Sequence, residues 1–172
     1  MSPEGGLILG KDIEQDLSCR DFTINALAYD IKNKKVIDPF KGKEDLEKKI
    51  IKAVINPSLR FNEDPLRIMR MLRFASELNF EIDLETLNCA KEQYLELKKC
   101  SIERIREEFN KLLLGQNPAK AITLMQEIGI MEIFIPEFSK CYKFEQNKYH
   151  HKDVFFHTLD VINNCIDSKI RQ

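Results

Sequence analysis

A carboxylate and three arginines follow one another at three-residue intervals in the stretch RFNEDPLRIMRMLRF. The four residues are Asp64, Arg67, Arg70 and Arg73. Steps of three on an α-helix place side chains on one slowly turning ridge, here opposite an apolar stripe of Ile68, Met69 and Leu72. An acid and a guanidinium one turn apart can read a planar group, because the carboxylate accepts from an exocyclic amine while the arginine donates to ring acceptors. The alternative is the solvated face of a surface helix.

The order of acid and arginine sets which planar group fits. Cytosine and adenine carry an amine beside an acceptor nitrogen on their pairing edges, whereas guanine and uracil reverse that order. Asp64 with Arg67 would therefore accept C and A and reject G and U. We interpret this pair as a candidate base reader.

A second charged group lies in the stretch SCRDFTINALAYD, residues 18–30. Ser18 followed three residues later by Asp21 predicts a capping box at the start of a helix that continues into the apolar residues. Arg20 and Asn25 are not explained by a cap. A guanidinium at a helix start opposes the helix dipole, so Arg20 favours a bound anion at this position. A capping box without any ligand is the structural alternative.

Two basic groups elsewhere have local explanations that we favour. Eight lysines fall within residues 32–52, where a solvated hairpin surface accounts for them and contact with an RNA backbone is the alternative. All three histidines lie in KYHHKDVFFHTLDVINN, in which His150, His151 and Asp153 precede a predicted helix that holds His157. No His-Asp doublet follows them, so the group is incomplete as a metal site.

Composition narrows the classes of protein further. The formal net charge is −1, with 43% hydrophobic and 32% charged residues, which is typical of a globular protein without a global positive field. The five cysteines include no C-x-x-C pair, so we expect reduced thiols and no zinc site. Residues 1–11 contain neither a basic segment nor a long apolar run. We therefore expect no signal peptide, no membrane span and a cytoplasmic location.

The elements that must position these residues change character along the chain. Residues 1–56 mix helix and strand: a strand end at Leu7–Leu9, a β-hairpin around Asn33 and Lys34, one or two helical turns in GKEDLEKK and a strand in IIKAVI. We expect these segments to form a small α/β portion.

From residue 57 onwards every segment has a helical period and almost no strand signal. Pro65 suits the first position of a helix over DPLRIMRMLRFASEL, capped by Asn62 or Asp64. Further helices are expected across 84–98, 102–114, 118–128 and 154–166. The fold class that we predict is predominantly α-helical with a small N-terminal α/β portion.

Four stretches carry a resemblance to a known family: EQDLSCRDFTINALA, IDPFKGKEDL, RFNEDPLRIMRMLRF and SIERIREEFNKLL, which cover most of residues 14–114. In this order they resemble the bacterial tRNA nucleotidyltransferase and poly(A) polymerase family, the CCA-adding enzymes of the eubacterial class. YHHKDVFFHTLDVI is similar to the beginning of an HD domain. The resemblance implies the C-terminal part of a nucleotidyltransferase head over 1–56, a helical nucleotide-recognition, neck and RNA-binding region over 57–140, and the start of an HD-like domain over 141–172.

In the first stretch, the resemblance implies a site for the sugar and phosphates of a nucleotide. Arg20 and Asp21 would contact the triphosphate and ribose, with Asn25 supporting them. Cys19 stands where the family pattern has the first of two arginines. This site is therefore expected to have one cation fewer than its relatives.

In the helical region, the resemblance implies the reader that the spacing already indicated. Asp64 and Arg67 would read the base edge, while Arg70 and Arg73 would hold phosphates. The stretch SIERIREEF would be a structural helix that braces the region behind them. His157 matches the first histidine of an HD metal centre and is the candidate metal ligand.

The catalytic centre of the family is a Gly-rich stretch followed by an Asp-x-Asp pair that holds two magnesium ions, and we expect it upstream of residue 1. In-line attack of an RNA 3′ hydroxyl on a nucleoside triphosphate requires those carboxylates. We expect Mg2+ in the intact family enzyme but not bound to these 172 residues. We also expect no useful turnover from this chain alone.

The function that we predict is the nucleotide-recognition and RNA-binding portion of an RNA 3′-end nucleotidyltransferase. ATP and CTP would be its substrates and RNA, specifically a tRNA 3′ end, its partner. A non-catalytic RNA-binding or assembly protein with the same fold is one alternative, and an HD-type phosphohydrolase is another. The residues leave open whether the parent enzyme adds CCA, CC, A or a poly(A) tail.

Overall fold

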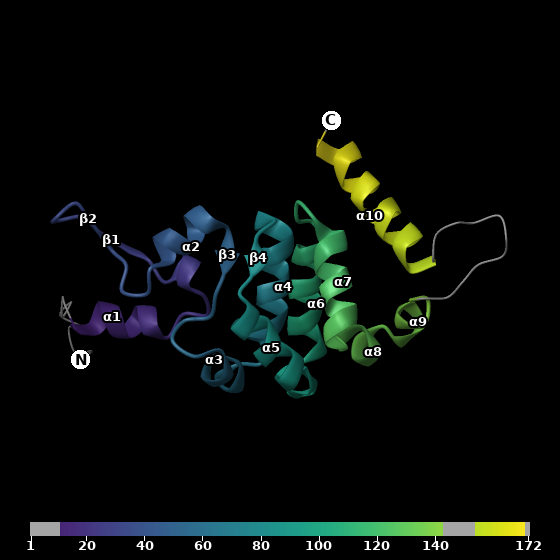
Figure 1. The fold of residues 1–172 in the computed structure, drawn as a ribbon, viewed down its shortest axis with the longest axis horizontal. Helices are drawn as coiled ribbons and strands as arrows, with labels where there is room; N and C mark the ends of the chain where they lie inside the picture. Colours follow the sequence, from purple (N-terminus) through teal and green to yellow (C-terminus); the bar gives the residue numbers. More distant parts are fainter. Residues whose placement is uncertain (1–10, 143–153, 171–172) are drawn as a thin grey trace, which may run out of the picture.

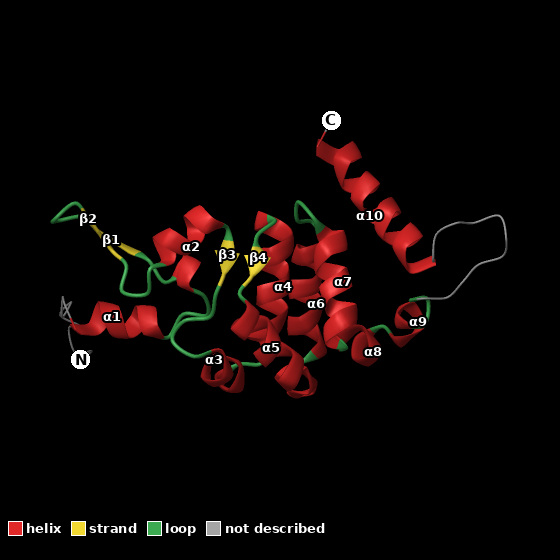
Figure 2. Ribbon diagram, viewed as in Figure 1, coloured by secondary structure: helices red, strands yellow, loops and turns green. Residues whose placement is uncertain are grey.

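The computed structural model of the chain describes residues 11–142 and 154–170. In chain order its elements are α1 (Lys11–Ser18), the 3-10 helix η1 (Thr23–Asn25), β1 (Ala28–Asp30), β2 (Lys35–Ile37), α2 (Gly42–Lys48), β3 (Ile50–Ile51), α3 (Pro57–Glu63), α4 (Leu66–Leu78), β4 (Glu81–Ile82), α5 (Leu84–Gln93), the 3-10 helix η2 (Tyr94–Lys99), α6 (Ile102–Leu113), α7 (Pro118–Ile128), α8 (Ile130–Phe134), α9 (Pro136–Ser139) and α10 (Val154–Ile170). Helices predominate, and the described strands form two small sheets (Figure 1, Figure 2). The predicted fold class is confirmed. The strand end predicted at Leu7–Leu9 lies outside the described residues.

The hairpin predicted around Asn33 forms as β1 and β2, which pair antiparallel with Asp30 opposite Lys35. Asp30 Oδ1 accepts hydrogen bonds from the amides of Lys32 and Asn33, and Oδ2 accepts one from the Asn33 side chain at 2.7 Å. These bonds, chiefly the one from the Asn33 amide, lower the pKa of Asp30 below its ordinary value. The turn is therefore held by one carboxylate that stays ionised.

The helix predicted to begin at Ser18 is wrong, because α1 ends at that residue. The Ser18 hydroxyl donates to the carbonyl of Gln15 at 2.6 Å, inside the preceding helix, so the predicted capping box is also wrong. Phe22 instead pairs with Ala53 in an antiparallel bridge and its ring is fully buried. This pairing joins segments about thirty residues apart, and no local periodicity reports such a contact.

α2 packs closely on the segment that follows Asp21. The carboxylate of Asp38 caps α2 by accepting from the amides of Gly42 and Lys43, at 2.7 and 3.0 Å. A side chain at Gly42 would collide with backbone, since a Cβ there would lie 2.0 Å from the carbonyl oxygen of Thr23. The Thr23 hydroxyl donates to Asp45 at 2.6 Å. Motif IDPFKGKEDL thus fixes the position of η1.

A second sheet joins the two halves of the described chain. β3, predicted as a longer strand, pairs in parallel with β4, so that Ile51 lies beside Ile82. The expectation of helix alone after residue 56 is wrong at β4, because a strand of two residues has no period to detect. The division at residues 56 and 140 stays a prediction.

α4 is the centre of the helical stack (Figure 1). It packs against α6 and α7, and its predicted stripe of Ile68, Met69 and Leu72 is fully buried. The expected helices are present as α4, as α5 continued by η2, and as α6, α7 and α10, whereas α3, α8 and α9 had no counterpart in the sequence prediction. Within the described ranges, no helix combines the length and apolar character that a membrane crossing requires.

Candidate functional site

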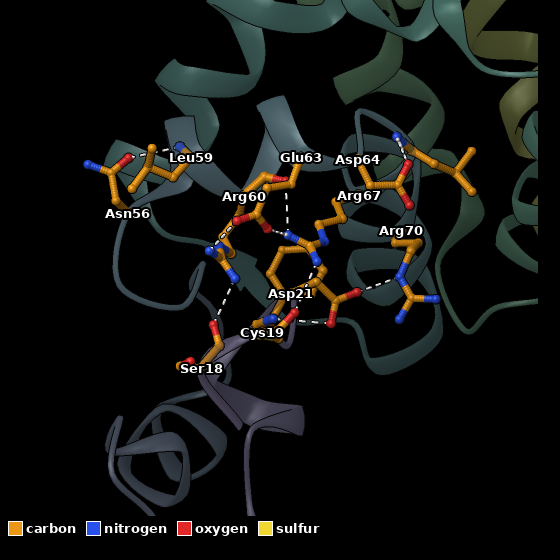
Figure 3. Close-up of polar contacts among 12 residues, drawn as sticks. Ser18, Cys19, Asp21, Asn56, Leu59, Arg60, Glu63, Asp64, Arg67 and Arg70 are labelled. Carbon is orange, nitrogen blue, oxygen red and sulfur yellow. Dashed lines mark hydrogen bonds and ion pairs between the residues drawn. The ribbon is translucent and has the colours of Figure 1, made fainter. Parts of the chain in front are cut away.

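Three arginines of α3 and α4 hold the segment that links α1 to η1 (Figure 3). Arg60 Nη1 donates to the Ser18 carbonyl at 2.7 Å, and Arg67 Nη2 donates to the Cys19 carbonyl at 3.0 Å. Arg70 Nε donates to the carboxylate of Asp21. We call Arg60, Arg67 and Arg70 the arginine bridge. It joins the two stretches in which the sequence analysis placed the candidate nucleotide site.

The direction of these side chains depends on a break between α3 and α4. Asn56 caps α3 by accepting from the Leu59 amide at 3.1 Å, and α3 ends at Glu63. Asp64 is extended, with φ −147° and ψ 99°, as expected for a residue that precedes a proline. Its Oδ1 then accepts from the Leu66 amide at 3.2 Å, so it also caps α4. Asp64 therefore lies at the turn between the two helices.

Arg67 is held by three acceptors. Its Nη1 donates to Glu63 at 2.8 Å and to the Arg60 carbonyl at 3.0 Å, in addition to the bond from Nη2 to Cys19. A guanidinium has five N–H donors. Within the described ranges, Nε–H and one Nη2–H of Arg67 have no partner. Two donors on an oriented side chain are thus available for acceptor atoms of a ligand.

The carboxylate of Asp64 is oriented from the other side by α6. Arg104 Nη2 donates to Asp64 Oδ2 at 2.9 Å. The Asp64 side chain keeps 33% of its surface exposed, and each carboxylate oxygen can accept more than one hydrogen bond. Arg104 belongs to the stretch SIERIREEF, expected to brace this region. The structure brings Asp64 and Arg67 together at one turn, where the Arg67 amide donates to the Asp64 carbonyl at 3.0 Å.

Asp21 is 5% exposed and all its contacts are internal. Its Oδ1 accepts from the Asn25 side chain at 2.6 Å and from the Phe22 amide at 3.2 Å, while Oδ2 accepts from Arg70. Burial alone would lower the pKa of Arg70, but the hydrogen bond and charge of Asp21 outweigh it and leave that pKa above its ordinary value. Asp21 and Asn25 therefore brace Arg70 and η1 in this structure, and their contact with a ribose stays a prediction.

Arg20 projects from the end of α1 and is 54% exposed at its side chain, where it pairs with Asp16 at 2.8 Å. Because α1 ends at Ser18, Arg20 follows a helix C-terminus, where a cation is favoured without any ligand. The argument from the helix dipole is wrong. The assignment of Arg20 to a triphosphate stays a prediction, now supported by its accessibility alone.

Arg73 is separated from the other arginines by its partners. Its Nη1 lies 3.2 Å from Glu108 of α6 and its Nε 3.5 Å from Glu77, and the guanidinium stacks over Phe74 at 4.4 Å from the ring centroid. Only 11% of the side chain is exposed. The structure does not bring Arg73 to the arginine bridge, so its proposed contact with phosphate stays a prediction that the geometry does not favour.

The described part of the chain contains no cluster that fits a metal ion. Within the described ranges, no group of three or more His, Cys, Asp or Glu side chains converges as metal ligands would. His157 is exposed on α10, whereas His150, His151 and Asp153, named with it above, lie outside the described residues. The metal role of His157 and the magnesium of the intact enzyme both stay predictions. In the described ranges, Cys19, Cys89, Cys100 and Cys141 form no disulfide bond.

Sequence reasoning missed Arg60, Glu63 and Arg104, the residues that orient the reader. Glu63 lies next to Asp64, but Arg104 is forty residues away along the chain. Arg60 and Glu63 lie inside the motif RFNEDPLRIMRMLRF, which is the signal that could have identified them. Neither belongs to the set of residues spaced by three from Asp64, so the spacing assigned them no role. Arg104 lay inside a stretch already considered structural.

The described fold, a small α/β portion followed by a stack of helices, matches a nucleotidyltransferase head joined to a helical body in known proteins. The family described as "Poly A polymerase head domain" matches residues 7–52. The family described as "Probable RNA and SrmB- binding site of polymerase A" matches residues 79–141.

Curated relatives and solved structures similar to this chain include CCA-adding enzymes. The enzyme of Limosilactobacillus reuteri is 54% identical over 112 residues, which are 65% of this chain and 28% of that protein. That of Staphylococcus epidermidis is 40% identical over 140 residues, covering 81% of this chain and 34% of that protein. The crystal structure of the Bacillus stearothermophilus CCA-adding enzyme in complex with CTP has a TM-score of 0.72 at 38% identity, covering 76% of this chain and 33% of that chain. The chain belongs to the CCA-adding enzyme and poly(A) polymerase family. It spans about a third of the length of the relatives it matches.

Proposed function

We propose that this chain carries the nucleotide-selecting and RNA-binding portion of an RNA 3′-end nucleotidyltransferase that uses CTP and ATP. The observation that carries the proposal is the turn at Asp64–Arg67, where an acceptor and a donor group are each held in one orientation by partners on other elements. Preorganised polar groups bind their ligand with little loss of conformational entropy. Solved relatives include complexes with CTP and with ATP.

Base selection follows from the hydrogen-bonding capacity of the pair. The exocyclic amine of cytosine or adenine would donate to Asp64, and the neighbouring ring nitrogen would accept from the unused N–H groups of Arg67. Guanine and uracil would set a carbonyl against the carboxylate of Asp64. Two acceptors facing each other leave both without a partner, which is more costly than the loss of an attractive contact.

The sugar and phosphates would lie on the side of the arginine bridge that faces the segment from Cys19 to Asp21. Arg20 is accessible there, and Arg70 is one third exposed. The Nε of Arg70 is ion-paired with Asp21, whereas its two Nη atoms make no hydrogen bond within the described ranges. Cationic groups that flank a base reader would bind the triphosphate whatever the base. This proposal assigns affinity to Arg20 and Arg70 and selectivity to Asp64 and Arg67.

RNA is the proposed macromolecular partner. The structure of the Thermotoga maritima CCA-adding enzyme complexed with tRNA has a TM-score of 0.65 at 32% identity, and it covers 79% of this chain and 32% of that chain. The eight lysines within residues 32–52 are all exposed here, which supports contact with a phosphate backbone and equally fits a solvated surface. Magnesium would be needed for nucleotide transfer. The described residues offer no site for it, so no step of the reaction is assigned to them.

The test is calorimetric titration of the 172-residue chain with each of ATP, CTP, GTP and UTP. We expect ATP and CTP to bind at least about tenfold more tightly than GTP and UTP, the factor that one lost hydrogen bond of about 1.4 kcal/mol produces. Asp64→Ala should abolish this difference, while Glu107→Ala, which removes an exposed acid of α6, should preserve it. Equal binding of all four nucleotides by the wild-type chain would refute the proposal.

A further inference from the structure

We propose that Arg60 is a positioning residue for base selection, which sets the orientation of Arg67 without touching the nucleotide. The inference rests on the proposed function, since it concerns how the reader at Asp64 and Arg67 is held. Arg60 lies on α3, and its side chain is 11% exposed. Arg67 is similarly buried, at 16%, but the guanidinium of Arg60 is committed to the Ser18 carbonyl and to Glu63, which leaves it without a free Nη pair for a ligand.

Arg60 reaches Arg67 by two routes. Its guanidinium binds one oxygen of Glu63 at 2.5 Å, and Arg67 binds the other oxygen of the same carboxylate at 2.8 Å. Its own backbone carbonyl accepts from Arg67 at 3.0 Å. Both Nη1 bonds of Arg67 therefore end on Arg60 or on a carboxylate that Arg60 holds (Figure 3).

Glu63 depends on Arg60 for its conformation. Its side chain is 49% exposed, so water competes for both of its oxygens. A half-exposed carboxylate held by a single arginine samples several rotamers, whereas one bound by two arginines is confined. Removal of Arg60 would release Glu63 toward solvent and would leave Arg67 with fewer fixed acceptors.

The same side chain also holds the segment that would carry the triphosphate. Arg60 Nη1 donates to the Ser18 carbonyl at 2.7 Å, next to the carbonyl of Cys19 that Arg67 binds. Its Nε is buried and has no partner among the described residues, so the guanidinium forms its two Nη contacts and no third bond there. The Arg60 side chain therefore contacts both Glu63, which orients the base reader, and Ser18, in the segment that would bind the triphosphate.

A purely structural role would have different consequences from a positioning role. If Arg60 only joins α3 to α1, its bond to Ser18 is sufficient. Loss of Arg60 would then lower stability, and the folded protein would still prefer ATP and CTP. A positioning role requires the path through Glu63 to Arg67, so its loss changes the ratio of affinities for matching and mismatching bases. The ratio is therefore the measurement that separates the two roles.

The experiment titrates ATP, CTP, GTP and UTP into the wild-type chain, Arg60→Ala, Arg60→Lys and the control Arg106→Ala. Arg106 is an exposed arginine of α6, so its removal changes the charge equally without touching the reader. We expect Arg60→Ala to lower the preference for ATP and CTP about tenfold, as for one lost charged hydrogen bond. Arg60→Lys should regain part of that preference, and Arg106→Ala should keep all of it.

Glu63→Ala keeps the inference testable if Arg60→Ala does not fold, because it removes the path to Arg67 and leaves the bond between Arg60 and Ser18. It should reproduce the loss of preference. A folded Arg60→Ala or Glu63→Ala chain with wild-type preference would overturn the inference. A wild-type chain without any preference would instead refute the proposed function, so the two failures are distinguishable.

Discussion

The two ends of α4 use the same residue type for different purposes. Near the N-terminal end, Arg67 donates to two backbone carbonyls and one carboxylate and keeps two N–H groups available in the described structure. Near the C-terminal end, Arg73 lies between Glu77 and Glu108 over the ring of Phe74. Their exposed fractions are similar, 16% and 11%, so burial does not separate them.

The difference comes from what packs against each end. The segment from Ser18 to Asp21 presents backbone carbonyls to Arg67, and these orient a guanidinium without neutralising it. Helix α6 presents the buried carboxylate of Glu108 to Arg73, which compensates its charge. An arginine ridge that is regular in sequence is thus divided into a part that can bind an anion or a base and a part that holds two helices together.

The largest effect is expected at the C-terminal end. Glu108→Ala should lower the free energy of unfolding by about 3 kcal/mol, because removal of one partner leaves Arg73 as a poorly compensated buried charge. Urea unfolding followed by circular dichroism measures this loss. Its neighbour Glu107 is exposed, and Glu107→Ala should change stability by less than about 0.5 kcal/mol. Equal effects of the two substitutions would contradict the structural role of Arg73.

An intermediate effect is expected where the arginine bridge meets Asp21. Asp21→Asn keeps the shape but removes the charge that faces Arg70, and should cost about 2 kcal/mol of unfolding free energy. Nucleotide affinity should fall as well, since Arg70 would lose its orientation. A loss of stability with unchanged affinity for ATP and CTP would show that Arg70 does not contact the ligand.

The difference in unfolding free energy between the wild-type chain and Asp21→Asn depends on pH through Arg70, whose pKa is raised in the folded chain. A group whose pKa is higher in the folded chain than in the unfolded chain stabilises the fold fully at pH below its unfolded-state pKa. This stabilisation is lost as the pH rises through its folded-state pKa. Arginine ordinarily stays protonated up to strongly alkaline pH. The contribution of Arg70 should therefore stay constant in urea titrations between about pH 6 and pH 9. A contribution that declines across that range would contradict this ion pair.

The smallest effect is expected at Cys19, whose backbone carbonyl, not its side chain, accepts from Arg67. Cys19→Ser should change stability by less than about 0.5 kcal/mol and leave base preference intact. Cys19→Arg would restore the second cation of the family pattern and should tighten binding of all four triphosphates equally. A change in base preference in either variant, measured by the same titrations, would place the thiol in the reader.

The sequence predicted the features of the molecule that are repeated locally. The buried stripe of α4 and the hairpin around Asn33 follow from local spacing. Asp64 and Arg67 are near each other because they are three residues apart, although Asp64 precedes α4. The proline after Asp64 also marked the turn at which the reader lies.

The failures of prediction have a common physical cause, which is contact between distant segments. The helix expected from Ser18 does not form because Phe22 pairs with Ala53, and Asp64 is oriented by Arg104. Neither contact leaves a periodic trace in the sequence. The roles predicted for Arg20 and Arg73 stay predictions, because spacing alone does not show which side chains pack against an arginine.

The central claim is that the pair Asp64 and Arg67 reads the pairing edge of a base. CTP and UTP have the same ribose, triphosphate and ring size, and they differ at the two edge positions that this pair would contact. Calorimetric titration of both nucleotides at one salt concentration therefore isolates the reader. We predict that CTP binds at least about tenfold more tightly than UTP, as for one hydrogen bond gained in place of two opposed acceptors. Equal affinities for CTP and UTP would contradict the claim.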